Sequence, residues 1–298
     1  MEPVPDDQHL AKTLSVGQAI GLGITIVVGS GLLVLPGLAY REVGDAAIWA
    51  WVGDALLVLP LLVVFGYLGS RYPSAGGIAG FVQAGFGRTG AAATEVLLIG
   101  TFCLGIPAIA ITGGNYMAAA VGGGSAVAAA SALALLVLGG AVNWLGASLS
   151  GRLQQVLAVV LVVLVTGGAA AALLAAPVVN PQVAELSDWE LAVPALGIVF
   201  FAYTGWEMLS FTAEEYRNPH RDFPLAIAGS FVAVVGMYLL IALGVQRSLD
   251  AEDPETVTAP VAALLTATFG SAAGRVVGVL GGVIIAANVV GAVWAASR

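Results

Sequence analysis

Long apolar segments recur along this chain of 298 residues, and they constrain its fold more than any other feature. Hydrophobic residues make up 59% of the sequence and charged residues only 9%, against about a quarter charged in an ordinary soluble domain. Several segments exceed the roughly 18 apolar residues that a helix needs to cross a hydrocarbon core of about 30 Å. They lack the alternating pattern of a membrane β-barrel. The sequence therefore predicts an all-α integral membrane protein.

We expect about eight membrane-spanning helices, with ranges near 15–40, 46–70, 91–118, 124–145, 153–176, 191–212, 225–246 and 272–297. Segment 72–88 is too polar and glycine-rich to span, so a cytoplasmic loop or a short re-entrant helix is expected there. The apolar stretch 261–269 is too short to span, and it is expected to form a helix lying on the outer surface. Residues 1–14 are expected to form a cytoplasmic tail, and residues 15–298 a single transmembrane domain.

The basic residues are distributed unevenly between the two sides of the predicted bundle. One side receives Lys12, Arg71, Arg88, Arg152, Arg217, Arg221 and Arg298. The opposite side receives only Arg41, Arg247 and Arg275. Because cytoplasmic loops carry the excess of lysine and arginine, this distribution predicts a cytoplasmic N-terminus, and we expect the protein in the cell membrane.

Two of the predicted spans are interrupted by residues that disfavour a continuous helix. The first span contains Gly29-Ser30-Gly31, and the sixth contains Tyr203-Thr204-Gly205-Trp206-Glu207. A broken helix exposes backbone N–H and C=O groups, and each one costs several kcal/mol in hydrocarbon unless a polar group meets it. Two breaks in corresponding positions of two structural halves indicate a binding site at the membrane midplane of a transporter.

The glycine residues of the first break allow an unwound backbone and close approach of a ligand. The N–H groups of the half-helix that follows, from Leu32 onward, carry a partial positive charge that suits a carboxylate. A second interpretation remains open here. Gly17, Gly21, Gly23 and Gly29 have small-residue spacings that let two helices pack closely.

An ionisable residue at membrane depth indicates a functional site by default. Glu207 lies within the second break, and we expect it to bind a substrate ammonium group or to act as a gate or proton site. The alternative is a glutamate that makes only structural hydrogen bonds. Asp54, about one turn inside an outer aromatic belt that includes Trp49 and Trp51, is expected to be interfacial, as is Glu95.

Other motifs exclude several classes of function. The sequence contains no nucleophile elbow, zinc-protease motif or P-loop, so we expect no enzyme activity. The single cysteine, Cys103, and two scattered histidines predict no metal site, and no cofactor is expected. A net charge of −8 without a basic patch argues against nucleic-acid binding. Three asparagines in or near the spans are expected to bond neighbouring helices: Asn115, Asn143 and Asn288.

Four motifs, in this order and spacing, resemble the amino acid–polyamine–organocation (APC) superfamily. They are Gly29-Ser30-Gly31, then Tyr72-Pro73-Ser74-Ala75-Gly76-Gly77 with Phe86-Gly87, then the run from Phe200 to Glu207, and finally the run from Arg217 to Pro224. The resemblance implies the LeuT-type inverted-repeat fold, with a first repeat over about 15–176, a partial second repeat over about 191–298, and helices 1 and 6 broken. Trp49-Ala50-Trp51 and the two loop motifs are most similar to the bacterial methionine and branched-chain amino acid exporter group.

The resemblance also implies roles for individual residues. The substrate carboxylate is expected on the backbone N–H groups of Gly29, Ser30 and Gly31. The ammonium group is expected on carbonyl groups of the segment that comprises Phe201, Ala202, Tyr203, Thr204 and Gly205. The gate or proton site is expected at Phe201, as the occluding aromatic residue, with Trp206 and Glu207.

The function implied is secondary active transport of neutral, apolar amino acids by export or exchange, through alternating access in the lipid bilayer. Coupling to H+ or Na+ and a homo-oligomeric state are compatible with it. A carrier of cationic amino acids or polyamines is an alternative.

Two departures from the family pattern matter. Some proton-coupled members carry a lysine on the fifth helix, whereas segment 154–176 has none. The fold needs ten helices and members usually have twelve, whereas this chain is expected to supply about eight. A truncated, non-transporting fragment of the same fold is therefore the second hypothesis.

Overall fold

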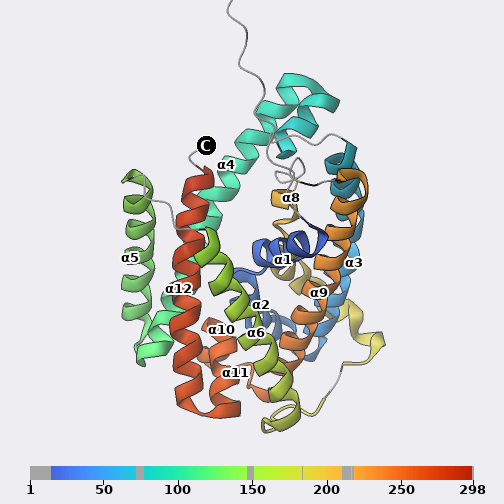
Figure 1. The fold of residues 1–298 in the computed structure, drawn as a ribbon. Coiled ribbons are helices and arrows are strands. Elements are labelled where there is room, and N and C mark those ends of the chain that lie inside the picture. Colours follow the sequence, from blue (N-terminus) through green and yellow to red (C-terminus); the bar gives the residue numbers. More distant parts are fainter. Residues whose placement is uncertain are drawn as a thin grey trace, which may run out of the picture.

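The computed structural model describes residues 15–71, 77–145, 151–182, 184–209, 216 and 218–296. This part of the chain is built from helices and their connections (Figure 1). The α-helices are α1 Val16–Val27, α2 Ser30–Val43, α3 Ala47–Arg71, α4 Gly77–Val121, α5 Ser125–Trp144, α6 Gly151–Ala175, α7 Val193–Phe200, α8 Trp206–Leu209, α9 Pro219–Ser248, α10 Pro254–Thr258, α11 Pro260–Phe269 and α12 Ser271–Ala296. Short 3-10 helices occur at η1 Gly44–Ala46, η2 Leu186–Ala192 and η3 Phe201–Tyr203.

Among the described residues, 6 helical stretches are long and apolar enough to cross a membrane. They are Ser30–Arg71, Ile78–Val121, Ser125–Trp144, Leu186–Tyr203, Pro219–Ser248 and Ser271–Val293. The first of them joins α2 to α3 across the short turn η1. The apolar stretch Val159–Ala175 of α6 is shorter. The expectation of an all-helical protein is confirmed, and the number of eight spans stays a prediction.

Helix α9 is the central element of one group of helices, because α1, α2, α3 and α6 all pack against it. A second group consists of α4, α5 and α12, with α5 at the edge of the bundle in Figure 1. Asn143 on α5 donates a hydrogen bond to the carbonyl oxygen of Val290 on α12, at 3.0 Å. The predicted role of Asn143 in joining two helices is therefore confirmed.

The two segments predicted not to span are short helices. Residues 77–86 form a helix that is separated from the rest of α4 by Gly87, whose φ of 73° is outside the helical region. This agrees with the short-helix interpretation of segment 72–88, although residues 72–76 lie outside the described part. Helix α11 begins at Pro260, whose missing N–H is not needed in a first turn, and it ends before Gly270.

Helix α10 packs against α2, the half-helix that follows the first break. The two backbones approach closely at Gly37, where a Cβ atom would overlap the carbonyl oxygen of Thr256. Only glycine fits there. This contact, together with those of α11, fixes the half of the first span that carries Ser30 and Gly31 at its start.

Candidate functional site

The first predicted break is present and buried. Helix α1 ends at Val27 and α2 begins at Ser30, so Val28 and Gly29 lie between them with non-helical backbone angles. Ser30 is only 6% exposed. The first N–H groups of α2 have no acceptor within their own helix, and they form its partially positive end. The break therefore presents donors that suit a carboxylate.

The second predicted break is also present. Helix α7 ends at Phe200, η3 forms a tight turn over Phe201–Tyr203, and α8 begins at Trp206. The turn is completed by Gly205, whose φ of 108° is a region that L side chains rarely adopt. The hydroxyl of Thr204 donates a hydrogen bond of 2.8 Å to the carbonyl oxygen of Phe201. The same carbonyl oxygen accepts a second hydrogen bond, of 3.3 Å, from the backbone N–H of Thr204, so both of its lone pairs are engaged within the turn.

The two breaks lie against each other. A Cβ atom on Gly31 would lie 3.0 Å from the Cα of Ala202, which is tighter than ordinary packing. A Cβ atom there would require its neighbour to move by a few tenths of an ångström. Among the glycines of the close-packing interpretation, Gly23 lies against Ser230 of α9, whereas a Cβ atom at Gly17 or Gly21 would meet nothing within 4 Å. On α9, the hydroxyl of Tyr238 lies 2.9 Å from the carbonyl oxygen of Ala202 and 3.2 Å from that of Val27. A single hydroxyl group thus lies within hydrogen-bond distance of carbonyl oxygens from both interrupted helices.

A cluster of three aromatic rings supports this junction. The ring centroid of Tyr238 lies 5.2 Å from those of both Trp51 and Tyr203, in edge-to-face arrangements. The hydroxyl of Tyr203 donates a hydrogen bond of 3.1 Å to the carbonyl oxygen of Trp51. The placement of Trp51 in an outer aromatic belt was wrong, because its side chain is 0% exposed. It packs inward, where the aromatic rings of η3 and α9 meet it.

The interfacial depth expected for Asp54 stays a prediction, but its side chain lies inside the protein and not at its surface. Its side chain is 0% exposed, and neither carboxyl oxygen has a hydrogen-bond partner in the described part of the chain. It lies on α3 one turn after Trp51, whose carbonyl oxygen accepts the hydrogen bond from Tyr203. Asp54 faces inward because α3 packs against α7, η3 and α9 on this side. Glu95, in contrast, is exposed on α4.

Asn288 on α12 lies beside the first break. A Cβ atom on Gly29 would come within 3.5 Å of the Asn288 side-chain amide nitrogen. The sequence predicted only an interhelical role for this residue. Its amide adds a neutral donor and acceptor next to the first turn of α2. Across α2, the hydroxyl of Tyr116 on α4 donates a 2.6 Å hydrogen bond to the carbonyl oxygen of Leu33.

The predicted gate residues differ in accessibility. Phe201 is 41% exposed, whereas Trp206 is 2% exposed and packs edge-on against Phe231 of α9. The backbone of Glu207 belongs to α8, but its side chain lies outside the described part. Phe201 is therefore the more accessible of these two aromatic gate candidates. Within the described residues, no group of three or more His, Cys, Asp or Glu could hold a metal ion.

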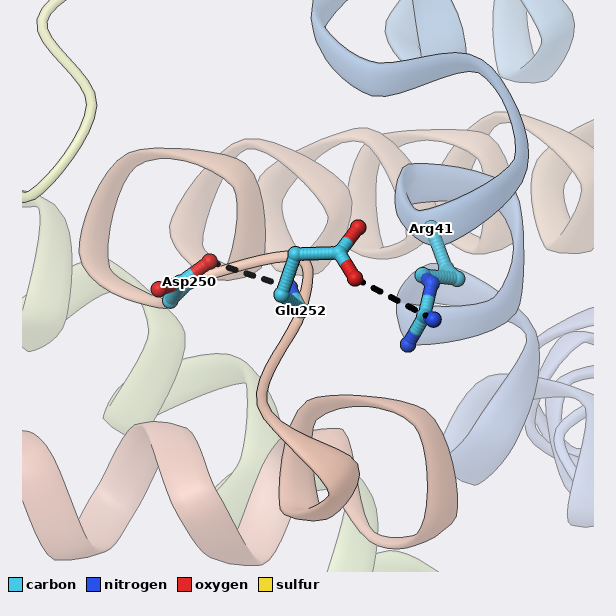
Figure 2. Close-up of polar contacts among 3 residues, drawn as sticks. All are labelled: Arg41, Asp250 and Glu252. Carbon is cyan, nitrogen blue, oxygen red and sulfur yellow. Dashed lines mark hydrogen bonds and ion pairs between the residues drawn. The ribbon is translucent and has the colours of Figure 1, made fainter.

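The C-terminal end of α2 is joined by an ion pair to the loop that follows α9. Figure 2 shows Arg41 paired with Glu252, with a distance of 3.2 Å between Nη2 and Oε2. The carboxylate of Asp250 in turn accepts a 3.0 Å hydrogen bond from the backbone N–H of Glu252 (Figure 2). Both charged side chains of the pair are substantially exposed, so the pair contributes about 0–1 kcal/mol.

Comparisons with known proteins identify the family of this chain and several relatives. A model of an amino acid permease family matches residues 14–298. The chain is 34% identical over 221 residues to the L-methionine/branched-chain amino acid exporter YjeH of Escherichia coli (strain K12), covering 73% of this chain and 52% of YjeH. It is 27% identical over 234 residues to the uncharacterised amino acid permease YecA of Bacillus subtilis (strain 168), covering 78% and 55%.

A third relative is the serine/threonine exchanger SteT of Bacillus subtilis (strain 168). The identity is 24% over 291 residues, which cover 94% of this chain and 65% of SteT. The chain spans about half the length of the first two relatives, with 52% and 55% of their residues covered.

Proposed function

Because this chain belongs to the amino acid permease family, we propose that it is a secondary active transporter of neutral, apolar amino acids of the methionine and branched-chain type. The family and the relatives point to a transporter rather than an enzyme, and to a multi-pass membrane protein. The proposal places the chain in the cell membrane with its N-terminus in the cytoplasm. Residues 15–298 then form one LeuT-type domain, with repeats over about 15–176 and 191–298.

The observation that carries the proposal is the junction of the two breaks. The N-terminal end of α2 meets Ala202 of η3 through Gly31, and the Tyr238 hydroxyl joins both segments. The first N–H groups of α2 therefore lie close to the carbonyl groups of η3. A zwitterion matches this arrangement, because its carboxylate suits the helix N-terminus and its ammonium suits the carbonyl groups.

In this proposal, Gly29, Ser30 and Gly31 bind the carboxylate. The segment from Phe201 to Gly205 binds the ammonium, although Tyr203 contributes through its backbone because its hydroxyl is bonded to Trp51. Phe201 covers the substrate, with Trp206 and Glu207 as the remaining gate candidates. The amide of Asn288 is added as a neutral contact next to Gly29.

The preference for a neutral substrate rests on the charges near the junction. Segments 27–32 and 200–206 contain no lysine, arginine, aspartate or glutamate, and Glu207, which follows directly, is the one acid of the second break. A substrate with a cationic side chain would need Glu207 as its partner. A charged side chain on the substrate would lose hydration without gaining a partner from these segments. Export or exchange is favoured over uptake by the likeness to YjeH and SteT, whose names state an exporter and an exchanger.

The test is counterflow of labelled methionine and leucine into proteoliposomes that contain this chain. Uptake that is competed by neutral amino acids but not by lysine or arginine supports the proposal. Competition by lysine, arginine or a polyamine would instead support the alternative function, a carrier of cationic amino acids or polyamines. A folded and inserted protein that shows no counterflow and no substrate binding would contradict the proposed function.

The junction itself is tested by a matched pair of glycine variants. Gly31→Ala should lower the affinity for methionine, because its Cβ would press on Ala202. Gly21→Ala should leave the affinity unchanged, because nothing lies within 4 Å of a Cβ at Gly21. Equal affinities for the two variants would remove the junction from the substrate site.

A further inference from the structure

Asp54 is the buried carboxylic acid, among the described residues, that the proposed transport function leaves unused. It is 0% exposed, and both of its carboxyl oxygens lack a hydrogen-bond partner in the described part of the chain. Burying an ionised carboxylate without a partner costs far more than burying a neutral carboxyl group. In this conformation the favourable form of Asp54 is therefore the neutral acid, which holds a proton.

The elements packed against α3 supply no cation that would stabilise a charged Asp54. Helix α7 has no ionisable residue, while η3 contributes Tyr203 and α9 contributes Tyr238. Arg41 is paired with Glu252. The ionisable residues of η1, of η2 and of the terminal turns of α2 and α9 are Tyr40, Arg41, Glu42, Asp45, Asp188, Glu190, His220, Arg221, Asp222 and Arg247.

Those residues lie toward the ends of the packed elements, whereas Asp54 lies within α3. It is seven residues after Ala47, the first residue of that helix, which corresponds to about 10 Å along the axis at 1.5 Å per residue. Glu207 on α8 is a further acid on a packed element, and its side chain lies outside the described part. A second acid would raise the cost of a charged Asp54 and would not lower it.

Asp54 is connected to the junction of the breaks by a short series of contacts. One turn earlier, the Trp51 carbonyl oxygen accepts the hydrogen bond from Tyr203. The ring of Tyr203 packs on Tyr238, and the hydroxyl of Tyr238 joins Val27 to Ala202. A separation of α3 from η3 and α9, which pack against it, would admit water to the buried Asp54 carboxyl and would also release the junction.

We propose that Asp54 is a proton-binding site whose occupancy is coupled to the arrangement of the two broken helices. When the helices separate and admit water, the carboxyl O–H bond breaks, its electron pair stays on Asp54, and the proton passes to water as hydronium. Reprotonation reverses the step and favours the packed junction. Because this linkage is reciprocal, a proton gradient biases the arrangement of the breaks. Its use in driving an amino acid across the membrane rests on the proposed function.

The protonation is tested by infrared difference spectroscopy of the full chain in lipid, recorded as the pH is raised above about 6. Exposed carboxyl groups are already ionised there, since they titrate near pH 4. The wild-type spectrum should contain the carbonyl stretching band of a protonated carboxylic acid, with loss of that band as the pH rises. The band should be absent from Asp54→Asn and retained in Glu95→Gln, whose residue is an exposed acid on α4. A band that persists in Asp54→Asn, or its absence from the wild type, overturns the proposal.

The coupling is tested by the pH profile of methionine counterflow in the same variants. The wild-type rate should change by about tenfold per pH unit on the limb where one group titrates, while Asp54→Asn should change less than about twofold over that range. An unchanged pH profile in Asp54→Asn contradicts the coupling. If counterflow in Asp54→Asn loses its dependence on sodium and keeps its dependence on pH, Asp54 binds Na+ and the proposed proton site is overturned. If the wild type carries no amino acid at any pH, the proposed function fails, whereas the infrared result still decides the protonation of Asp54.

Discussion

The two breaks differ in how the fold holds them. The first, at Val28 and Gly29, is enclosed by α9, α12 and η3, and the Ser30 that follows it is 6% exposed. The second carries Phe200 and Phe201 at its start, and these side chains are 39% and 41% exposed. One break is thus an enclosed end of a helix, and the other presents accessible aromatic rings.

This difference indicates that the two breaks have different roles within the proposed site. An enclosed helix terminus keeps its N–H groups in a fixed direction and costs no reorganisation when a carboxylate binds. A turn that exposes aromatic side chains, followed by Gly205 at a φ of 108°, is suited to rearrangement over a bound substrate. We therefore expect changes at the first break to affect substrate affinity, and changes at the second to affect occlusion and transport rate.

The largest effect is expected for Gly31→Leu. A leucine side chain would overlap Ala202 and fill the approach to the α2 N-terminus, so methionine binding should fall below detection in an equilibrium binding assay. Membrane insertion should be retained, because leucine is favourable within a span. Gly21→Leu is the control, since Gly21 has nothing within 4 Å of its Cβ position. Unchanged affinity in an inserted Gly31→Leu protein would exclude Gly31 from the site.

The second effect in size is expected for Tyr238→Phe, which affects both breaks together. Removing the hydroxyl leaves the carbonyl oxygens of Val27 and Ala202 without this donor, and a buried unsatisfied group costs about 1–3 kcal/mol. The thermal midpoint of the detergent-solubilised protein should fall, and methionine affinity should fall with it. Tyr67→Phe on α3 is the control, because Tyr67 is 57% exposed. If both variants melt alike, the Tyr238 hydroxyl does not hold the breaks together.

The positions of the helices and of both breaks could be predicted from the sequence, whereas the residues that support the breaks could not. Apolar runs and glycines are local signals, and the structure interrupts both helices at the predicted residues. The burial of Trp51 and Asp54 was not predicted because α3 is apolar on nearly all its faces. Such a helix gives no indication of which face is buried. Asn288 and Tyr238 are single polar residues in apolar spans, and only the tertiary packing brings them beside Gly29 and Ala202.

A smaller effect is expected for Gly205→Ala, which distinguishes the role of the second break from that of the first. At a φ of 108° the backbone conformation costs a residue with a Cβ atom about 1–2 kcal/mol, so the turn after Tyr203 should change its conformation. The counterflow rate should fall several-fold, while methionine affinity should change less than in Gly31→Ala. Gly197→Ala is the matched control within α7, because nothing lies within 4 Å of its Cβ position. A larger loss of affinity than of rate would contradict the assignment of the second break to occlusion.

The smallest effect is expected at the C-terminal end of α2, away from both breaks. Arg41→Gln removes the ion pair with Glu252, and an exposed pair contributes about 0–1 kcal/mol. A double-mutant cycle with Glu252→Gln, read as unfolding midpoints at low and high salt, isolates the pair from other effects of each substitution. The coupling should be small and should decrease with salt. A coupling well above 1 kcal/mol, or a change in methionine affinity, would mean that the enclosed break depends on this ion pair and not only on Tyr238 and Gly31.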